Sequence, residues 1–499
     1  MEEYDLHSNL IEKYLKKNAN EFTRKDIIKY IEENEIEMVN FRYVAEDGKL
    51  KTLNFIINSR EHLENVLASG ERVDGSSLFS FIEAGSSDLY VIPCFSSVFV
   101  NPFSEIPAID ILCSFYTSEG KPLESAPEYI LKKAHDTFKN QTGLNFKALG
   151  ELEFYIISEK NNEFPVQDQK GYHSSAPFIK WNDFRIQAMK LIAECGGKIK
   201  YGHSEVGNFS TETLSYEQHE IEFLPVDVEE TAEKIIIAKW ILRMLAFQYG
   251  IQVSFSPKIT VGKAGSGMHI HLLVEKNCKN VLIKNEKLSR TAHKIIAGIL
   301  DLAPALTAFG NSVPTSYLRL VPHQEAPTRI CWGIRNRSVL VRVPLGWKGV
   351  SNMVCDANPL EEKNDNNFSS KQTIELRSAD GSADIYLLLA GIVTAARHGF
   401  EMPNAVDFAK KLYIDVNIFK DEAKELAKSL NHLPSSCSES ADKLNEKRRY
   451  FEKYGVFPAG TIDNVIRYLK AFNDLGLSEK LYGNNKEIQK LIEKYLHWK

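Results

Sequence analysis

Residues 265–271 read G-S-G-M-H-I-H, a run in which small residues give way to alternating apolar and imidazole side chains. Successive side chains of a β-strand point to opposite faces, so His269 and His271 would share one face while Met268 and Ile270 share the other. Glycines just before a strand typically permit a tight turn or the close approach of another backbone. An isolated H-x-H pair is as often structural as functional, so its meaning depends on what neighbouring strands present.

The same alternation recurs in stretches far apart in the chain: A-L-G-E-L-E-F-Y, Q-H-E-I-E-F, W-G-I-R-N-R-S-V-L-V-R-V and T-I-E-L-R. Each reads as a β-strand or β-like run with polar residues backed by apolar neighbours. Together they predict a curved sheet with a polar inner cleft and an apolar outer side that packs on helices. The charged residues that these stretches and the nearby H-S-E-V segment contribute are Glu151, Glu153, Glu205, Glu220, Arg335, Arg337, Arg342, Glu375 and Arg377.

The carboxylates of such a cleft cannot all stay ionised without cations, because like charges a few ångströms apart raise one another's pKa. Carboxylates with one or two imidazoles and no thiolate suit Mg²⁺ or Mn²⁺ better than structural zinc. Arginines beside the ions can bind carboxylates or phosphates bidentately and offset charge on a transferred phosphoryl group. The pattern therefore predicts phosphoryl transfer, without a P-loop because no G-x-x-x-x-G-K-[ST] segment is present.

The length and composition of the chain limit the classes of protein to which it can belong. At 499 residues, with 43% hydrophobic and 25% charged residues, the chain fits an ordinary globular protein of two domains. No apolar run approaches the ~20 residues that span a bilayer, and the acidic N-terminus lacks the features of a secretory signal, so we expect a cytoplasmic protein with no membrane partner. The seven scattered cysteines predict reduced thiols, and a net charge of -5 argues against nucleic-acid binding.

The periodicities along the chain predict three regions. Residues 1–37 have the spacing of two amphipathic helices, and a hairpin at residue 38 opens a small β-rich domain that extends to residue 127. Residues 128–499 contain the alternating stretches, a Pro-punctuated loop with Arg319 and Glu325, and a mostly helical part from Ile385 onward. Asp74 and Asp88 lie in turns of the small domain, where aspartate is common for local hydrogen-bonding reasons.

The motifs D-G-S-S, E-L-E-F, G-S-G-M-H-I-H, R-L-V-P-H-Q-E-A-P, R-N-R-S and I-E-L-R occur in the order in which the glutamine synthetase family has them, and the chain resembles its bacterial type I branch in particular. The resemblance covers about residues 38–470, and the ordered set is specific although each motif alone is weak. It implies an α+β fold, with an N-terminal β-grasp domain and a catalytic domain in which helices surround a curved antiparallel sheet. It also implies a homo-oligomer, usually a dodecamer of stacked rings, with active sites between neighbouring subunits.

The resemblance further implies roles for the residues that match the family's motifs. The ligands implied for one divalent ion are Glu153, Glu205 and Glu220, and those for a second are Glu151, His269 and Glu375. The residues implied for glutamate are Gly265, Arg319, Glu325, Arg337 and Arg377, and those for ATP are Tyr172, His271, Arg342 and Arg377. Asp74 and Asp88 would bind ammonium in the neighbouring subunit's site, and the residues implied for catalysis are Asp74, which would take the ammonium proton, Glu325, which would close over the intermediate, and Arg337.

The implied reaction transfers the γ-phosphoryl group of ATP to the γ-carboxylate of L-glutamate, after which ammonia displaces phosphate and L-glutamine forms. Two alternatives stay open: a relative that ligates glutamate to a polyamine or another amine, and a catalytically silent homologue. A metal-dependent hydrolase fits less well because it leaves the ordered arginines unexplained. Four departures from the family pattern bear on this choice. Ser204 stands in place of a histidine, Ala264 in place of an asparagine, Leu273 in place of a serine and Thr373 in place of an arginine.

Overall fold

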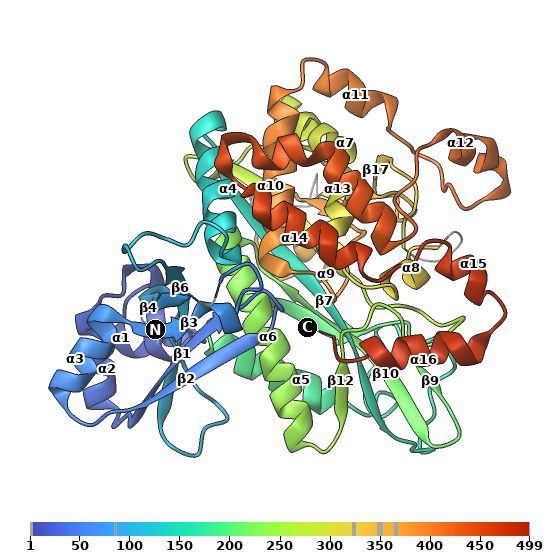
Figure 1. Ribbon diagram of the computed structural model, residues 1–499. Helices are drawn as coiled ribbons and strands as arrows, with labels where there is room; N and C mark the ends of the chain where they lie inside the picture. The colour runs from blue at the N-terminus through green and yellow to red at the C-terminus, as the bar shows by residue number, and fades with distance from the viewer. Residues whose placement is uncertain are drawn as a thin grey trace.

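The computed structural model describes residues 3–83, 85, 87–321, 326–346, 353–363 and 368–498. Two large β-sheets organise these residues. Figure 1 shows the N-terminal sheet and its helices, in blue, beside the larger second sheet, with most helices of the C-terminal part in the upper half of the view and the last helix, in red, lower at the right.

The first sheet is built on a hairpin, which confirms the prediction for the segment after residue 38. Its strands are β1 (Met38–Val44), β2 (Leu50–Ile56), β3 (Glu71–Asp74), β4 (Asp88–Pro93), β5 (Phe99–Val100) and β6 (Ala108–Tyr116). β1 pairs antiparallel with β2 and parallel with β6, which gives the order β2-β1-β6-β4-β3, with β5 added to β6. The helices whose apolar residues share its core are α1 (Leu10–Leu15), α2 (Arg24–Glu33) and α3 (Arg60–Ser69). The two N-terminal helices were therefore predicted correctly.

The second sheet carries the alternating stretches. Its strands are β7 (Asn145–Glu159), β8 (Ile199–Ser204), β9 (Phe209–Ser210), β10 (Leu214–Phe223), β11 (Val226–Asp227), β12 (Gln252–Ser254), β13 (Met268–Lys276), β14 (Lys279–Asn280), β17 (Trp332–Ile334), β18 (Val341–Val343) and β19 (Ile374–Leu376). The main order is β17-β18-β19-β13-β7-β10-β8, and all of its pairs are antiparallel except β17 with β18. A separate hairpin joins β15 (Ile283–Lys284) and β16 (Lys287–Leu288).

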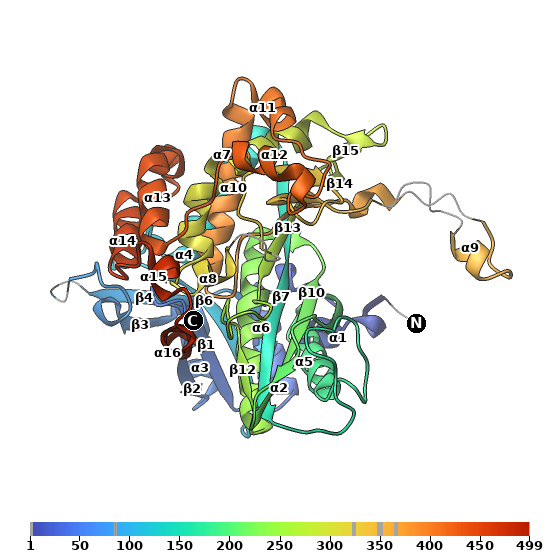
Figure 2. The ribbon, with the colours of Figure 1, turned by 90° about the vertical axis from the view of Figure 1, so that its right-hand side faces the viewer.

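The predicted alternation along β7 and β13 is confirmed. Leu152, Phe154, Met268 and Ile270 are completely buried on the outer side of the sheet. α6 (Val228–Gln248) packs against this side, and Figure 2 shows it alongside β7, β13 and β10. Burial of these four side chains stabilises the sheet by about 1.5–3 kcal/mol each. The opposite side of the same strands is left for polar residues.

Some of the remaining described helices pack on the second sheet and others pack on helices, whereas the short helix at residues 353–357 lies apart from the sheet (Figure 2). These remaining helices are α4 (Pro127–Thr142), α5 (Asn182–Glu194), α7 (Arg290–Gly310), α8 (Ser316–Arg319), α9 (Met353–Ala357), α10 (Ile385–Glu401), α11 (Ala405–Lys411), α12 (Lys424–Ser429), α13 (Cys437–Glu452), α14 (Ala459–Lys470), α15 (Leu477–Leu481) and α16 (Asn485–Tyr495). α7 and α10 approach so closely that a Cβ at Gly298 would clash with the carbonyl oxygen of Ala395. Among the described helices, α7 alone is long and apolar enough to cross a membrane, and 78% of its apolar window is buried, as in the core helix of a folded domain.

Two local predictions were wrong. The expected β-like run that carries Arg335, Arg337 and Arg342 is interrupted, because β17 ends at Ile334 and Arg335 has a left-handed φ of +61°. The Asn336 side chain then accepts a hydrogen bond from the Ser338 amide at 3.0 Å, which makes a turn, and β18 begins only at Val341. The expected loop around Arg319 also contains the short helix α8, which ends at that arginine.

Candidate active site

Three cross-strand rows of polar residues lie on the inner side of the second sheet. Their spacing follows from the register of β8, β10, β7, β13, β19 and β18, since positions two apart along a strand share a face. The rows are His269 with Glu151 and Glu222, then Glu153 with Glu220 and His203, then His271 with Glu375 and Arg342. Strands remote in sequence are thereby brought to one surface.

These rows line a cavity of about 1040 Å³. The residues predicted from the sequence that line it are Glu151, Glu153, Tyr172, Glu205, Glu220, His269, His271, Arg337, Arg342, Glu375 and Arg377. A small cavity of about 40 Å³ adjoins it and is lined by Gly265 and Arg319 together with Glu153, His269 and Arg377. The structure thus brings together nearly all the predicted site residues.

Glu151, His269 and Glu375 form one compact group, in which one ligand atom from each residue lies within 4.8 Å of the others. The Glu151 Oε2 atom lies 2.8 Å from His269 Nδ1, and Glu375 Oε1 lies 3.6 Å from the same nitrogen. Burial alone would raise the pKa of Glu151, but the imidazoles of His271 and His269 hold this pKa well below its usual value. The group was predicted as one ion's ligand set, and its geometry suits a divalent cation.

A second group of the same compactness contains His203, Glu205 and Glu220. His203 Nε2 lies 3.1 Å from Glu220 Oε1 and takes the place at which Glu153 was expected. Glu153 Oε2 instead accepts hydrogen bonds from the Gly267 amide at 2.8 Å and from Gln218 Nε2 at 3.0 Å. The pKa of Glu220 is raised by burial and by the neighbouring carboxylates Glu151 and Glu153. A cation at this point would offset that repulsion.

Glu222 is a site residue that the sequence reasoning missed. It forms a third compact group with Glu151 and His271. Glu222 is 1% exposed; one of its carboxylate oxygens lies 2.7 Å from Lys200 Nζ, and the other is buried without a hydrogen-bond partner. A buried, unpartnered carboxylate oxygen beside further carboxylates fits the presence of a cation. The sequence pattern that could have identified Glu222 is its spacing from Glu220, which is the same E-x-E alternation as in β7.

Arginines occupy the end of the cavity where β18 and β19 lie. Arg342 Nη1 donates to Glu375 Oε2 at 2.8 Å, and Arg377 Nε donates to Glu375 Oε1 at 2.9 Å. Arg337 lies in the turn before β18, and its carbonyl oxygen accepts a hydrogen bond from Arg377. Arg319 is 6% exposed and donates to the Ser378 carbonyl at 2.9 Å, which fixes it at the small cavity. The cluster can bind carboxylate or phosphate groups.

Gly265 and Tyr172 lie at the edges of this region. A Cβ at Gly265 would clash with the carbonyl oxygen of Pro257, so the close approach predicted for this glycine is confirmed. Its own carbonyl accepts from Gln218 Nε2 at 3.0 Å. Tyr172 is half exposed and stacks on His173, with ring centroids 4.2 Å apart, which leaves part of its ring free to contact a planar ligand group.

Three predicted residues lie apart from the cavity or outside the described residues. Asp74 ends β3 and Asp88 begins β4, directly opposite each other in the first sheet, and both are exposed. Neither is among the described residues that line the cavity of the same chain. Hydrogen bonds from Ser77, Ser76 and Ser87 hold the pKa of Asp74 well below its usual value, so its carboxylate is ionised. Glu325 lies outside the described residues.

Sequence profiles of two domains match the chain. The profile described as "Glutamine synthetase, catalytic domain" matches residues 124–471, and that described as "Glutamine synthetase, beta-Grasp domain" matches residues 35–118. The glutamine synthetase of Clostridium saccharobutylicum is 29% identical over 476 residues, which are 92% of this chain and 99% of the relative. That of Thermococcus kodakarensis is 31% identical over 426 residues, which are 85% of this chain and 86% of the relative.

Solved structures share the fold. The glutamine synthetase of Plasmodium falciparum superposes with a TM-score of 0.75 at 20% identity and covers 92% of this chain and 97% of its own. A structure described as apo GmaS superposes with a TM-score of 0.70 at 18% identity and covers 90% of this chain and 95% of its own. The predicted fold class, a β-grasp domain followed by a curved antiparallel sheet with surrounding helices, is confirmed. The chain therefore belongs to the glutamine synthetase family, whose members are ligases.

Proposed function

We propose that the protein joins ammonia to the γ-carboxylate of L-glutamate at the expense of ATP and gives L-glutamine, ADP and phosphate. The observation that carries the proposal is the single cavity in which carboxylate and imidazole rows from β7, β10 and β13 face the arginines near β18 and β19. Activation of a carboxylate by phosphorylation needs both kinds of group. We also propose that the protein is cytoplasmic and follows the type I branch of the family.

We propose two Mg²⁺ or Mn²⁺ ions in the cavity. Glu151, His269 and Glu375 would hold one, and Glu205 and Glu220 the other, with Glu153 or His203 completing its ligands. When bound, the ions would supply positive charge to the phosphoryl oxygens of ATP and so ease the transfer. The donor set supports hard divalent ions, since it consists of carboxylates and imidazoles without a thiolate.

The arginines and the small cavity support the roles proposed for the two substrates. Arg319 and the backbone at Gly265 would hold the glutamate carboxylate and amino groups, with Arg337, Arg377 and Glu325 nearest the reacting end. Arg342, Arg377 and His271 would contact the ATP phosphates, and Tyr172 the adenine side. Charge that develops on the transferred phosphoryl group would then be offset by arginines already fixed by hydrogen bonds to Glu375.

We propose that Asp74 and Asp88 complete the cavity of a neighbouring subunit in a homo-oligomer, arranged as the family's dodecamer. Their exposure on the first sheet, away from the cavity of their own chain, supports this arrangement. The lowered pKa of Asp74 supports binding of ammonium by an ionised carboxylate. Ammonium would lose a proton to Asp74 before ammonia attacks the phosphorylated glutamate.

The test is the release of phosphate from ATP by the purified protein with Mg²⁺ and glutamate, in the presence of ammonium, putrescine or spermidine. We expect turnover that depends on ammonium and glutamine as the product. Turnover that needs an amine but not ammonium would identify a γ-glutamyl-amine ligase. No turnover with any of these amines would contradict the ligase activity proposed for this chain and favour the silent homologue.

A further inference from the structure

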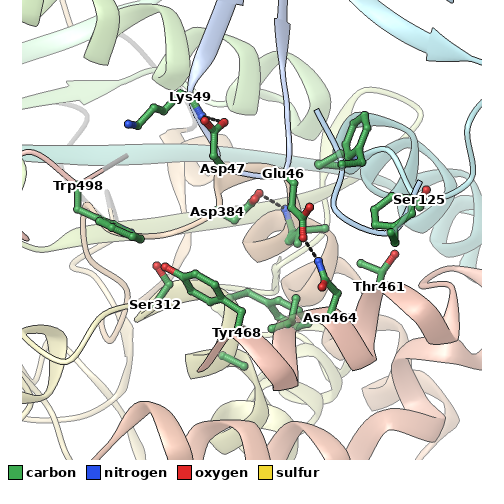
Figure 3. A pocket seen from close by; sticks show the side chains of 17 residues that line it. Glu46, Asp47, Lys49, Ser125, Ser312, Asp384, Thr461, Asn464, Tyr468 and Trp498 are labelled. Atoms are coloured by element: carbon green, nitrogen blue, oxygen red, sulfur yellow. Dashed lines mark hydrogen bonds between the residues drawn. The ribbon is translucent and has the colours of Figure 1, made fainter. Parts of the chain in front are cut away.

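A cavity of about 220 Å³ lies at the junction of the domains, and its wall includes the β1–β2 turn, the helices α7, α10 and α14, and Trp498. Two of its carboxylates already have partners within the protein. Figure 3 shows the hydrogen bond that Asn464 donates to Glu46, and Glu46 also accepts from the Ser80 amide at 2.6 Å. Asp384 caps the start of α10. These carboxylates are therefore bonded without a ligand, whereas a lysine in the candidate active site is placed differently.

Lys200, on β8, lines the candidate active-site cavity, and the family resemblance implies no role for it. Its side chain is 42% exposed, and its Nζ atom lies 2.7 Å from a carboxylate oxygen of Glu222. Glu222 in turn forms a compact group with Glu151 and His271. An ammonium group has three N–H donors, and the bond to Glu222 uses one of them. The other donors can serve a ligand that enters the cavity.

A β-bulge turns Lys200 toward the cavity. Along β8, Tyr201 is opposite Glu222, and Ile199 is opposite Phe223. Lys200 is thus an extra residue with no partner position on β10. In a regular strand it would point away from the face on which Tyr201 lines the cavity, yet it lines the same cavity. Bulges re-aim side chains and are frequent beside active sites, so the backbone itself presents this lysine to the cavity.

Lys200 lies beside the aromatic end of the cavity. Its Nζ atom is 5.0 Å from the centre of the Tyr201 ring, and the Tyr201 and His203 rings are 5.8 Å apart. His203 also contacts Tyr172, the residue proposed for the adenine side, with ring centroids 5.5 Å apart. A nucleotide with its base at Tyr172 and its terminal phosphates at Arg342 would therefore bring the phosphate nearest the ribose toward Lys200.

Positive charge is scarce on this side of the cavity. Among the described residues that line it, Arg337, Arg342 and Arg377 all lie near β18 and β19, and Lys200 is the only lysine or arginine on β8 and β10. The carboxylate of Glu222 would repel the negative charge of a bound phosphate, and an ammonium group beside both offsets that repulsion.

We propose that Lys200 binds the α-phosphate of the nucleotide, the phosphate joined to the ribose; this inference rests on the proposed use of ATP in the cavity. Glu222 would hold the ammonium group through one N–H, and phosphate oxygens would accept from the others. The contact would be the same with ATP and with ADP, so Lys200 would contribute to nucleotide affinity and little to the rate of phosphoryl transfer.

The test is titration calorimetry of the full-length protein with Mg²⁺ and either ADP or AMP. We expect Lys200→Met to weaken both nucleotides by a similar factor, on the order of tenfold, as when one hydrogen bond to a charged group is lost. Lys200→Arg keeps the charge and should stay within about threefold of the wild type. Lys198→Met is the matched control, because that side chain is exposed and does not line the cavity. In initial-rate measurements, Lys200→Met should raise the KM for ATP and leave kcat within about twofold.

A double-mutant cycle with Glu222→Gln separates contact with the nucleotide from mere neutralisation of Glu222. If Lys200 binds phosphate, Lys200→Met should weaken ADP about equally in the wild type and in Glu222→Gln. Thermal unfolding without nucleotide checks that each variant is folded.

Three results would overturn the proposal: Lys200→Met binds ADP as tightly as the wild type, its loss of affinity disappears in Glu222→Gln, or ADP is weakened while AMP is not. In each of these cases the wild type still binds ADP, so the proposed function stands. A wild type that binds neither nucleotide would overturn the proposed use of ATP, and this inference with it.

Discussion

His269 Nδ1 lies 2.8 Å from Glu151 Oε2, and the other oxygen of the same carboxylate lies 2.9 Å from His271 Nε2. Glu151 therefore links two imidazoles from one face of β13 and belongs to two of the three compact groups in the cavity. This position follows from the register in which Glu151 is opposite His269 and also opposite Glu222. Two of the three compact groups therefore depend on the negative charge of Glu151.

We expect Glu151→Gln to lower kcat by at least about 10²-fold, since it removes a charge that positions both the imidazoles and a divalent ion. The rise in melting temperature that Mg²⁺ or Mn²⁺ causes in the wild type should be lost, because an ion that binds only the folded protein stabilises it. Phosphate release and thermal unfolding with and without metal measure the two effects. Glu159→Gln, at the exposed end of the same strand, is the matched control and should change neither. A metal-induced shift that survives in Glu151→Gln would contradict its role as a ligand.

Arg337 and Arg335 lie two residues apart in the turn between β17 and β18, and both are exposed. Only Arg337 is among the described residues that line the cavity. We expect Arg337→Ala to lower kcat on the order of 10²-fold, as when one preorganised charge is removed from a transition state, and Arg335→Ala to stay within about twofold of wild type. Initial rates at saturating glutamate and ATP measure this difference. Equal effects of the two substitutions would contradict the role proposed for Arg337 in the reaction.

The carboxyl group of Glu128, at the start of α4, supplies a pH dependence of stability outside the site. Burial raises its pKa to about 7 from an ordinary 4.5, although the Phe115 amide donates to it at 3.0 Å. Between pH 4.5 and 7 the folded protein keeps a proton that the unfolded chain releases, so the free energy of unfolding falls as the pH rises through this window.

We expect Glu128→Gln, which cannot ionise, to gain stability over the wild type by about 3 kcal/mol between pH 4.5 and pH 8. Urea unfolding of both proteins at several pH values measures this gain. Glu124→Gln is the control, because that side chain is 71% exposed, and its stability should follow the wild type. A constant difference between Glu128→Gln and the wild type across the window would show that Glu128 is ionised in the folded state.

The sequence predicted the faces of the strands more reliably than their partners. A period of two along β7 and β13 places Glu151, Glu153, His269 and His271 on one side whatever the strands pair with, so this part of the site could be predicted. Pairing register depends on packing across the whole sheet and cannot be read from one strand. For this reason His203 was not expected beside Glu220, although the register places the two opposite each other.

Other misses have local physical causes. Glu222 repeats with Glu220 the spacing of Glu151 and Glu153, but only Glu220 of the Q-H-E-I-E-F segment was predicted as a site residue. The turn at Arg335 depends on a left-handed backbone at a non-glycine residue, which the pattern of apolar residues does not report. The cavity at the junction of the domains was also missed, since Glu46, Asp384 and Trp498 are far apart in sequence and no period relates them.

The separation of Asp74 from the cavity of its own chain gives a test of shared active sites. Asp74→Asn and Glu151→Gln should each be inactive for a different reason, because the first would damage the neighbour's site and the second its own. A shared site takes Glu151 from one subunit and Asp74 from its neighbour in a closed ring. In oligomers assembled from equal amounts of both variants, each half of a site is intact with a probability of about one half, so about one site in four has both intact. We expect activity to return to about a quarter of the wild-type value after the two are denatured and refolded together, or expressed together. Refolding each variant alone is the control, and neither should recover. If the mixture stays inactive while size-exclusion chromatography shows mixed oligomers of wild-type size, Asp74 does not complete a neighbouring subunit's site.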